Sequence, residues 1–174
     1  MAEARAIIKD IEKAKRTLEK LGAESQGSYS FTDTIFAPKS NNFNLNNETL
    51  RLRSIKKSNH ETKPFVLVQK KYELKNGIQK DKTLLRKEFN TENEALGFIH
   101  TYFKFNPLFE YYRDGEEFHL GKARIFIEDI KDFKPCVEVE AKDEKDIEEI
   151  FLKLNIAERL TETLPETMRK IILN

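Results

Sequence analysis

Charged side chains stand at every second position in segments that are otherwise apolar enough to form β-strands. Glu138 and Glu140 alternate with valines, and Arg51 and Arg53 alternate with leucines. Side chains at positions i and i+2 share one face of a strand, so each pair presents two like charges to one side of a sheet. If that side of the sheet faced solvent, such a pair of like charges would be ordinary. An inward orientation would require a cation between the carboxylates and an anion between the guanidinium groups, and this arrangement predicts a barrel lined with charge.

Lys70 follows the same pattern on a neighbouring segment. It falls on the same face as Val66 and Val68, whereas Lys71 points to the opposite face and is expected in solvent. A buried lysine without a partner would lose its charge, because desolvation disfavours the charged form. A bound anion is the simpler explanation for Lys70.

The charge of the chain is distributed unevenly along its length. The 174 residues carry a formal net charge of +1, yet residues 51–87 are strongly basic and residues 88–150 are strongly acidic. A basic half folded against an acidic half can bind phosphate oxygens and a divalent cation in one cavity. The balanced total gives no general signal for nucleic-acid binding, and aromatic residues are not interleaved with the basic stretch as stacking platforms usually are.

Several functional classes are disfavoured by residue content. Cys136 is the single cysteine, so an intrachain disulfide and a thiolate zinc site are excluded, and a reducing, cytoplasmic location is expected. His60, His100 and His119 lack metal-ligand spacing. No Gly-rich phosphate loop is present, and we expect neither a signal peptide nor a membrane span, because no apolar stretch is long enough.

The elements that must position these residues follow an α+β order, and we expect a single domain over residues 1–174. Asp10 and Thr91 are expected to cap helices, with Gly22 ending the first. Helices are expected at 10–21, 91–103, 144–154 and 165–173. A loop is expected at 38–47 and a turn at 75–77. Strands are expected at 2–8, 29–36, 49–55, 64–72, 83–89, 109–113, 117–120, 123–130 and 135–141.

The order of seven short segments resembles the CYTH family, which comprises class IV adenylyl cyclases and thiamine triphosphatases and is also called the triphosphate tunnel metalloenzymes. The segments are Glu3-Ala4-Arg5, Asp33-Thr34-Ile35-Phe36, Leu50-Arg51-Leu52-Arg53, Val68-Gln69-Lys70, Arg86-Lys87-Glu88, Ile127-Glu128-Asp129-Ile130 and Glu138-Val139-Glu140. The resemblance implies an eight-stranded antiparallel β-barrel with flanking helices. It also implies that the barrel binds a triphosphate together with Mg²⁺ or Mn²⁺.

The resemblance implies a set of cations that hold the triphosphate. Most match the family pattern directly, and Arg5 stands where the family has lysine. The implied phosphate ligands are Arg5, Arg51, Arg53, Lys70, Arg86, Arg113 and Arg124.

The implied metal ligands are Glu3, Glu88, Glu138 and Glu140. The first acid of the family's N-terminal motif falls at Met1, and the last acid of another motif falls at Asn90. The chain therefore either starts late or has lost one carboxylate on the metal side, while the phosphate site is nearly complete. Glu3 and Glu128, which stands in place of the usual Asp, are the carboxylates expected to orient a water molecule.

These residues predict an enzyme that hydrolyses tripolyphosphate or a nucleoside or thiamine triphosphate, with the metal neutralising the charge that develops on phosphate oxygens. A class IV adenylyl cyclase is one alternative, but no set of residues that would select adenine is recognisable. A binding module without turnover is the other alternative, because of the missing acids. The expected partner is a small triphosphate molecule, without nucleic acid or membrane, and the chain is expected to be a monomer or homodimer.

Overall fold

One antiparallel sheet closes on itself in the computed structural model, which describes residues 1–40 and 43–174. The strand order is β5-β4-β3-β2-β6-β7-β8-β1-β9. The strands are β1 (Ala2–Ile7), β2 (Glu24–Ala37), β3 (Glu48–Lys57), β4 (Phe65–Lys75), β5 (Ile78–Phe89), β6 (Asn106–Leu120), β7 (Ala123–Ile130), β8 (Cys136–Ala141) and β9 (Glu158–Arg159). The helices are α1 (Ile11–Lys20), α2 (Glu92–Tyr102), α3 (Glu144–Lys153) and α4 (Leu164–Ile172).

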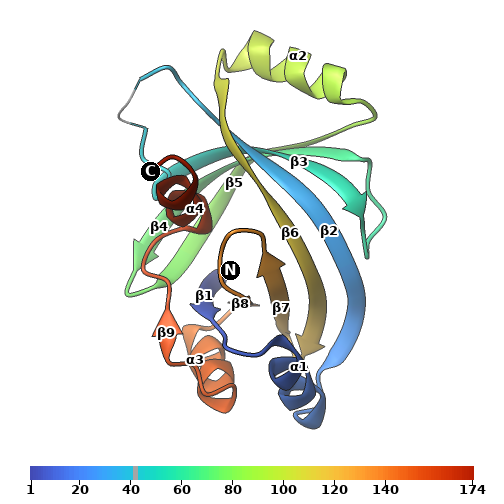
Figure 1. The fold of residues 1–174 in the computed structure, drawn as a ribbon, viewed down its shortest axis with the longest axis vertical. Coiled ribbons are helices and arrows are strands. Elements are labelled where there is room, and N and C mark those ends of the chain that lie inside the picture. Colours follow the sequence, from blue (N-terminus) through green and yellow to red (C-terminus); the bar gives the residue numbers. More distant parts are fainter. Residues whose placement is uncertain (41–42) are drawn as a thin grey trace.

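Strand β1 closes the barrel. It pairs with β8 along its whole length and with β5 at Ala2 and Glu3. The short β9 pairs with β1 at Ala6 and Ile7. The result is an eight-stranded antiparallel β-barrel with four flanking helices, which confirms the predicted fold class (Figure 1). Within the described residues, the helices are too short or too polar to cross a membrane.

The local signals for helices and turns are confirmed. The side chain of Asp10 accepts a hydrogen bond from the Lys13 amide at 3.0 Å and begins α1, and Thr91 does the same for the Glu94 amide at 3.2 Å and begins α2. Asn76 and Gly77, both with positive φ, make the predicted turn between β4 and β5. Of the loop predicted at 38–47, residues 41 and 42 lie outside the described residues.

The prediction of two separate strands at 109–113 and 117–120 was wrong, because β6 runs through Gly115 without a break. Glycine next to Asp114 suggests a turn, but here the missing side chain makes room for the ring of Tyr29 on the neighbouring β2. Strand β2 is also longer than predicted, since it begins at Glu24 and includes an irregularity in register near Gly27.

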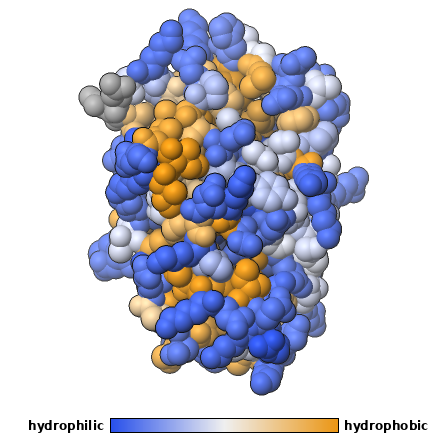
Figure 2. All heavy atoms as spheres, in the orientation of Figure 1, coloured by the Kyte–Doolittle hydropathy of each residue, from blue (hydrophilic) through white to orange (hydrophobic). Residues whose placement is uncertain are grey.

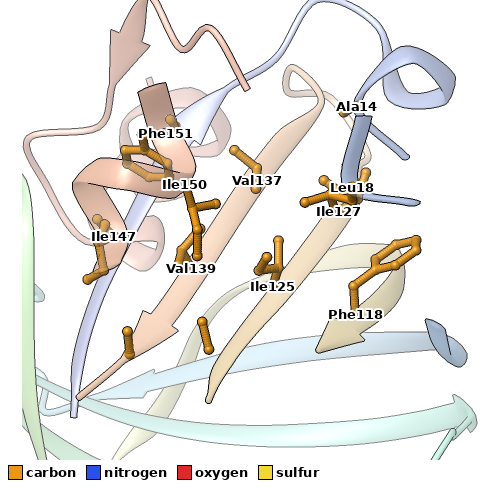
Figure 3. Packing of buried hydrophobic residues seen from close by; sticks show 14 of the residues in the cluster. Ala14, Leu18, Phe118, Ile125, Ile127, Val137, Val139, Ile147, Ile150 and Phe151 are labelled. Atoms are coloured by element: carbon orange, nitrogen blue, oxygen red, sulfur yellow. The ribbon is translucent and has the colours of Figure 1, made fainter. Parts of the chain in front are cut away.

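The apolar core lies on the outer surface of the barrel, between the sheet and the helices. Figure 3 shows Ile125, Val137 and Val139 of the sheet beside Leu18 of α1 and residues of α3. Helix α2 covers another part of the sheet at the opposite end of the molecule (Figure 1). Alternate side chains of each strand therefore pack in the core between sheet and helices, and the remaining ones line the barrel interior.

The surface drawn in Figure 2 is mainly hydrophilic, with apolar side chains gathered in patches between charged ones. Such scattered patches are ordinary on a folded chain. The charged side chains that bear on function are those inside the barrel.

We expect Gly115→Ala to lower the free energy of unfolding by about 1–3 kcal/mol, because overpacking a filled interior forces its neighbours to move. A Cβ at this position would lie 2.7 Å from Cε2 of Tyr29. Gly97→Ala is the matched control, since a Cβ on this α2 residue has no neighbour within 4 Å. The control should gain up to about 1 kcal/mol from helix propensity. Urea unfolding measures both, and equal stability of the two variants would contradict the packing argument.

Candidate functional site

A cavity of about 280 Å³ lies inside the barrel, and most of the residues predicted for the site line it. They come from β1, β3, β4, β6, β7 and β8, so the closed sheet brings together charges that are far apart in the sequence. The predicted residues that line the cavity are Glu3, Arg5, Arg51, Arg53, Lys70, Arg113, Arg124, Glu138 and Glu140.

Asp33 organises the arginines on one side of this cavity. Its fully buried carboxylate accepts hydrogen bonds from Arg53 at 2.7 and 2.8 Å and from Arg113 at 2.9 Å, and it lies 3.8 Å from Arg51. Burial alone would raise the pKa of Asp33, but Arg53 and Arg51 outweigh it and hold the pKa well below its usual range. Arg53 and Arg113 are therefore held rigidly and partly neutralised.

Arg51 is held more loosely than the other two arginines. Its Nε is buried and has no hydrogen-bond partner among the described residues. A buried donor without a partner is costly, and a bound oxyanion would satisfy it. Arg51 is thus the arginine of this cluster best placed to accept a new anion.

Glu128 lies behind the cavity wall, where it holds two cations. Its Oε2 accepts from Arg5, and its Oε1 accepts from Tyr29 at 2.7 Å and from Arg113 at 2.5 Å. Burial opposes ionisation, but Arg113 and Arg5 prevail and lower the pKa of Glu128 to about 2. This corrects the predicted role of Glu128 in orienting water, because both oxygens are occupied and the side chain is fully buried.

Three carboxylates from β1 and β8 meet in the cavity. Glu3 lies opposite Glu140 in the β1–β8 register, and one oxygen from each of Glu3, Glu138 and Glu140 lies within 4.8 Å of the others. Arg5 pairs with Glu138, and Arg124 pairs with Glu140 at 2.9 Å, whereas Glu3 accepts a hydrogen bond from the neutral amide of Gln79.

This trio fits a divalent cation. Burial, followed by repulsion from Glu138, raises the pKa of Glu3 to about 8, and the pKa of Glu140 is raised for the same two reasons. Oxygens this close can reach one hard cation, which prefers carboxylate ligands and would remove the repulsion.

Arg86 and Glu88 lie away from the cavity, which corrects their predicted roles as phosphate and metal ligands. They pair with each other at 3.0 Å, with side chains 51% and 34% exposed. Glu88 also accepts from Thr62 Oγ1 at 3.4 Å and from the Lys63 amide at 3.3 Å. Strand β1 reaches β5 only at Gln79 and Lys80, so the segment of β5 with Arg86 is remote from the β1 carboxylate.

Glu117 is a cavity residue that the sequence patterns did not predict. It lines the cavity, is only 1% exposed, and accepts from His60 at 2.6 Å, Asn59 at 2.8 Å, His119 at 2.9 Å and Arg124 at 3.0 Å. Burial opposes ionisation, but these four hydrogen bonds lower the pKa of Glu117 to about 2. Its spacing of four from Arg113 on one strand is the signal that could have identified it.

Asp81 is a second acid that was missed. It pairs with Lys70, whose side chain lines the cavity. An anion that binds Lys70 must therefore compete with a carboxylate. The sequence signal is weak, because Asp81 lies in the polar run that opens β5.

The comparisons with known proteins agree with this architecture. The PH1012 protein from Pyrococcus horikoshii OT3 is 17% identical with a TM-score of 0.76, over 95% of this chain and 98% of that one. The PH1819 protein from the same organism is 11% identical with a TM-score of 0.77, over 98% and 99%. HpAC1 from Hippeastrum, an adenylyl cyclase candidate described as revealing a dominant triphosphatase activity, is 11% identical with a TM-score of 0.69, over 97% and 95%.

At these identities the structural similarity shows the fold alone. A search of curated proteins finds no significant match. The family comparison is more specific, since the pattern described as CYTH domain matches residues 1–171. A match over nearly the whole length shows that this chain belongs to the CYTH domain family.

Proposed function

We propose that this protein hydrolyses a triphosphate at its terminal phosphate in a metal-dependent reaction. The observation that carries the proposal is that one cavity holds both the carboxylate trio Glu3, Glu138 and Glu140 and a cluster of arginines. Phosphoryl transfer needs little covalent participation from protein, so a site that positions phosphates and balances their charge is sufficient. The triphosphatase activity named for HpAC1 supports hydrolysis as the reaction of this cavity.

Glu3, Glu138 and Glu140 would hold the metal, as the family's metal dependence requires. A bound Mg²⁺ or Mn²⁺ supplies positive charge to phosphate oxygens. Arg5 and Arg124 hold Glu138 and Glu140 through ion pairs, and Gln79 donates a hydrogen bond to Glu3. Among the described residues, this site thus has three carboxylates.

The arginines would bind the phosphates. Asp33 holds Arg53 and Arg113 in fixed positions, so these two groups need little reorganisation when charge develops on the phosphate oxygens. Arg51 supplies the donor without a partner, and Lys70 supplies a further cation once Asp81 is displaced. Of the two carboxylates predicted to orient water, Glu3 lines the cavity and remains the proposed one.

Product analysis tests this function. The protein is incubated with tripolyphosphate or ATP in the presence of Mg²⁺ or Mn²⁺, and the products are separated. We expect orthophosphate with pyrophosphate from tripolyphosphate, and orthophosphate with ADP from ATP. Cyclic AMP with pyrophosphate as the main products would identify a cyclase, and binding of tripolyphosphate without turnover would identify a binding module.

We expect Arg51→Ala to weaken tripolyphosphate binding by about 1.5–3 kcal/mol, the range for a charge-assisted hydrogen bond in a partly buried site. The loss should be smaller for orthophosphate, because fewer oxygens reach the arginine cluster. Calorimetry with Mn²⁺ measures both affinities. Lys71→Ala is the control, since Lys71 is an exposed cation on the nearby β4. If both variants lost the same affinity for tripolyphosphate, the effect would come from general surface charge and not from a contact of Arg51.

A further inference from the structure

The connection between β3 and β4, residues 58–64, reaches the mouth of the cavity. Asn59 and His60 at its tip line the cavity together with the arginines and carboxylates. The His60 side chain is 56% exposed, while Glu117 beneath it is 1% exposed, so the tip lies at the boundary between cavity and solvent. Neither Asn59 nor His60 belongs to the proposed phosphate or metal ligands.

One buried carboxylate anchors this tip. Asn59 Nδ2 donates to Oε2 of Glu117 at 2.8 Å, and His60 Nε2 lies 2.6 Å from the same oxygen. The other oxygen of Glu117 is used by groups from the barrel wall, His119 at 2.9 Å and Arg124 at 3.0 Å. Glu117 thus joins the tip to the barrel through one oxygen and is itself held in place through the other.

Independent contacts hold the rest of the connection against the barrel. A Cβ built on Gly27 of β2 would lie 3.3 Å from Cβ of Asn59, so the tip packs closely on backbone that carries no side chain. Lys57 Nζ donates to Ser28 Oγ at 2.6 Å, and Glu88 accepts from Thr62 and Lys63 on the other side. Glu88 thus contacts this connection from outside the cavity.

The cavity behind the tip is small. Its volume of about 280 Å³ lies at the lower end of the roughly 300–1,000 Å³ that accommodates a drug-sized ligand. Phosphates and a metal ion bound to the arginine cluster and the carboxylate trio would fill much of that volume. A nucleoside on the α-phosphate, the end opposite the terminal phosphate, needs further room, and Asn59 and His60 line the cavity where it borders solvent.

We infer that Asn59 and His60, anchored on Glu117, determine the substrate specificity of the site and make it favour compact inorganic triphosphates over nucleoside triphosphates. The docked tip admits an unsubstituted triphosphate, whereas a nucleoside triphosphate must first break the two hydrogen bonds to Glu117 Oε2. Selection arises from an added cost for the wrong ligand rather than from extra contacts to the right one. The inference rests on the proposed function, because it takes this cavity as the triphosphate site.

The test measures affinity, so that it does not depend on turnover. Diimidotriphosphate, in which NH replaces both bridging oxygens, and adenylyl imidodiphosphate resist hydrolysis at the terminal phosphate, and calorimetry with Mn²⁺ gives the dissociation constant of each. We expect the native protein to bind diimidotriphosphate at least about tenfold more tightly, which is about 1.4 kcal/mol. The double variant Asn59→Ala with His60→Ala should reduce this ratio to about threefold or less by gaining affinity for the nucleotide. His60→Ala alone removes an exposed side chain and should move the ratio in the same direction.

The matched control is His119→Ala, which removes a contact to the same carboxylate from the barrel wall and leaves the tip anchored. Its affinity ratio should equal that of the native protein. Equal affinity of the native protein for both ligands, or an unchanged ratio in the double variant, would overturn the inference. Correct ratios without hydrolysis of either parent triphosphate would overturn the proposed reaction alone, and failure to bind either ligand would overturn both.

Discussion

Arg5→Met should lower the free energy of unfolding by about 3–5 kcal/mol, the usual cost of leaving a buried charge without its partner. Arg5 is 7% exposed and donates to both Glu128 and Glu138. Glu128 is fully buried, so after the substitution it must stay charged with Arg113 as its remaining cation, or take up a proton. Methionine preserves much of the side-chain volume, which limits the cavity contribution.

Urea unfolding at neutral pH measures this loss. Lys15→Met is the matched control, because Lys15 pairs with Glu116 at 2.7 Å but both side chains are partly exposed to solvent. An ion pair of that kind contributes about 0–1 kcal/mol. A loss below about 1 kcal/mol for Arg5→Met would show that the buried carboxylates relax into water, and would contradict the rigid charge network described above.

Glu3→Gln should reduce metal-dependent hydrolysis about 100-fold or more, since loss of an outer partner of a metal ligand already costs about 10–100-fold. The same substitution should stabilise the metal-free protein. The pKa of Glu3 is raised from an ordinary 4.5 to about 8, first by burial and then by Glu138. Between these values the folded chain keeps a proton that the unfolded chain releases, so native stability falls as pH rises from 4.5 towards 8.

The gain from Glu3→Gln should therefore be small near pH 4 and grow to on the order of 5 kcal/mol above pH 8, given about 1.4 kcal/mol for each pKa unit. Urea unfolding in the presence of a chelator, repeated across this pH range, measures it. Glu73→Gln is the control, because Glu73 is an exposed acid on β4 that does not line the cavity. A gain independent of pH, or a variant with full metal-dependent activity, would remove Glu3 from the metal site.

The sequence by itself determined the features that depend on neighbouring positions. The two-residue spacing of Glu138 and Glu140 was sufficient to predict a strand with both acids on one face, and they meet Glu3 in the structure. The caps at Asp10 and Thr91 were predictable for the same reason, since a cap acts within one turn of its own helix. The family resemblance then supplied the closed barrel and its likeness to a triphosphate tunnel.

Partners from distant strands could not be predicted in this way. A period of two shows that Glu128 and Glu138 each lie on one face of a strand, but it does not show that Arg5 will occupy both carboxylates. That pairing depends on how β1, β7 and β8 are aligned when the barrel closes. The family resemblance therefore implied the same role for Glu128 as for Glu3, and only their different burial and neighbours separate them.

The same limit explains Glu88 and Glu117. Both are strand glutamates with charged neighbours, and the motif pattern favoured Glu88 for the site. The structure places Glu117 in the cavity and Glu88 against the β3–β4 connection, because β1 closes the barrel on β5 only at its first residues. The sequence alone determined which side chains share a face of each strand. Only the tertiary structure decided which faces meet, since register and closure come from pairing between segments far apart in the chain.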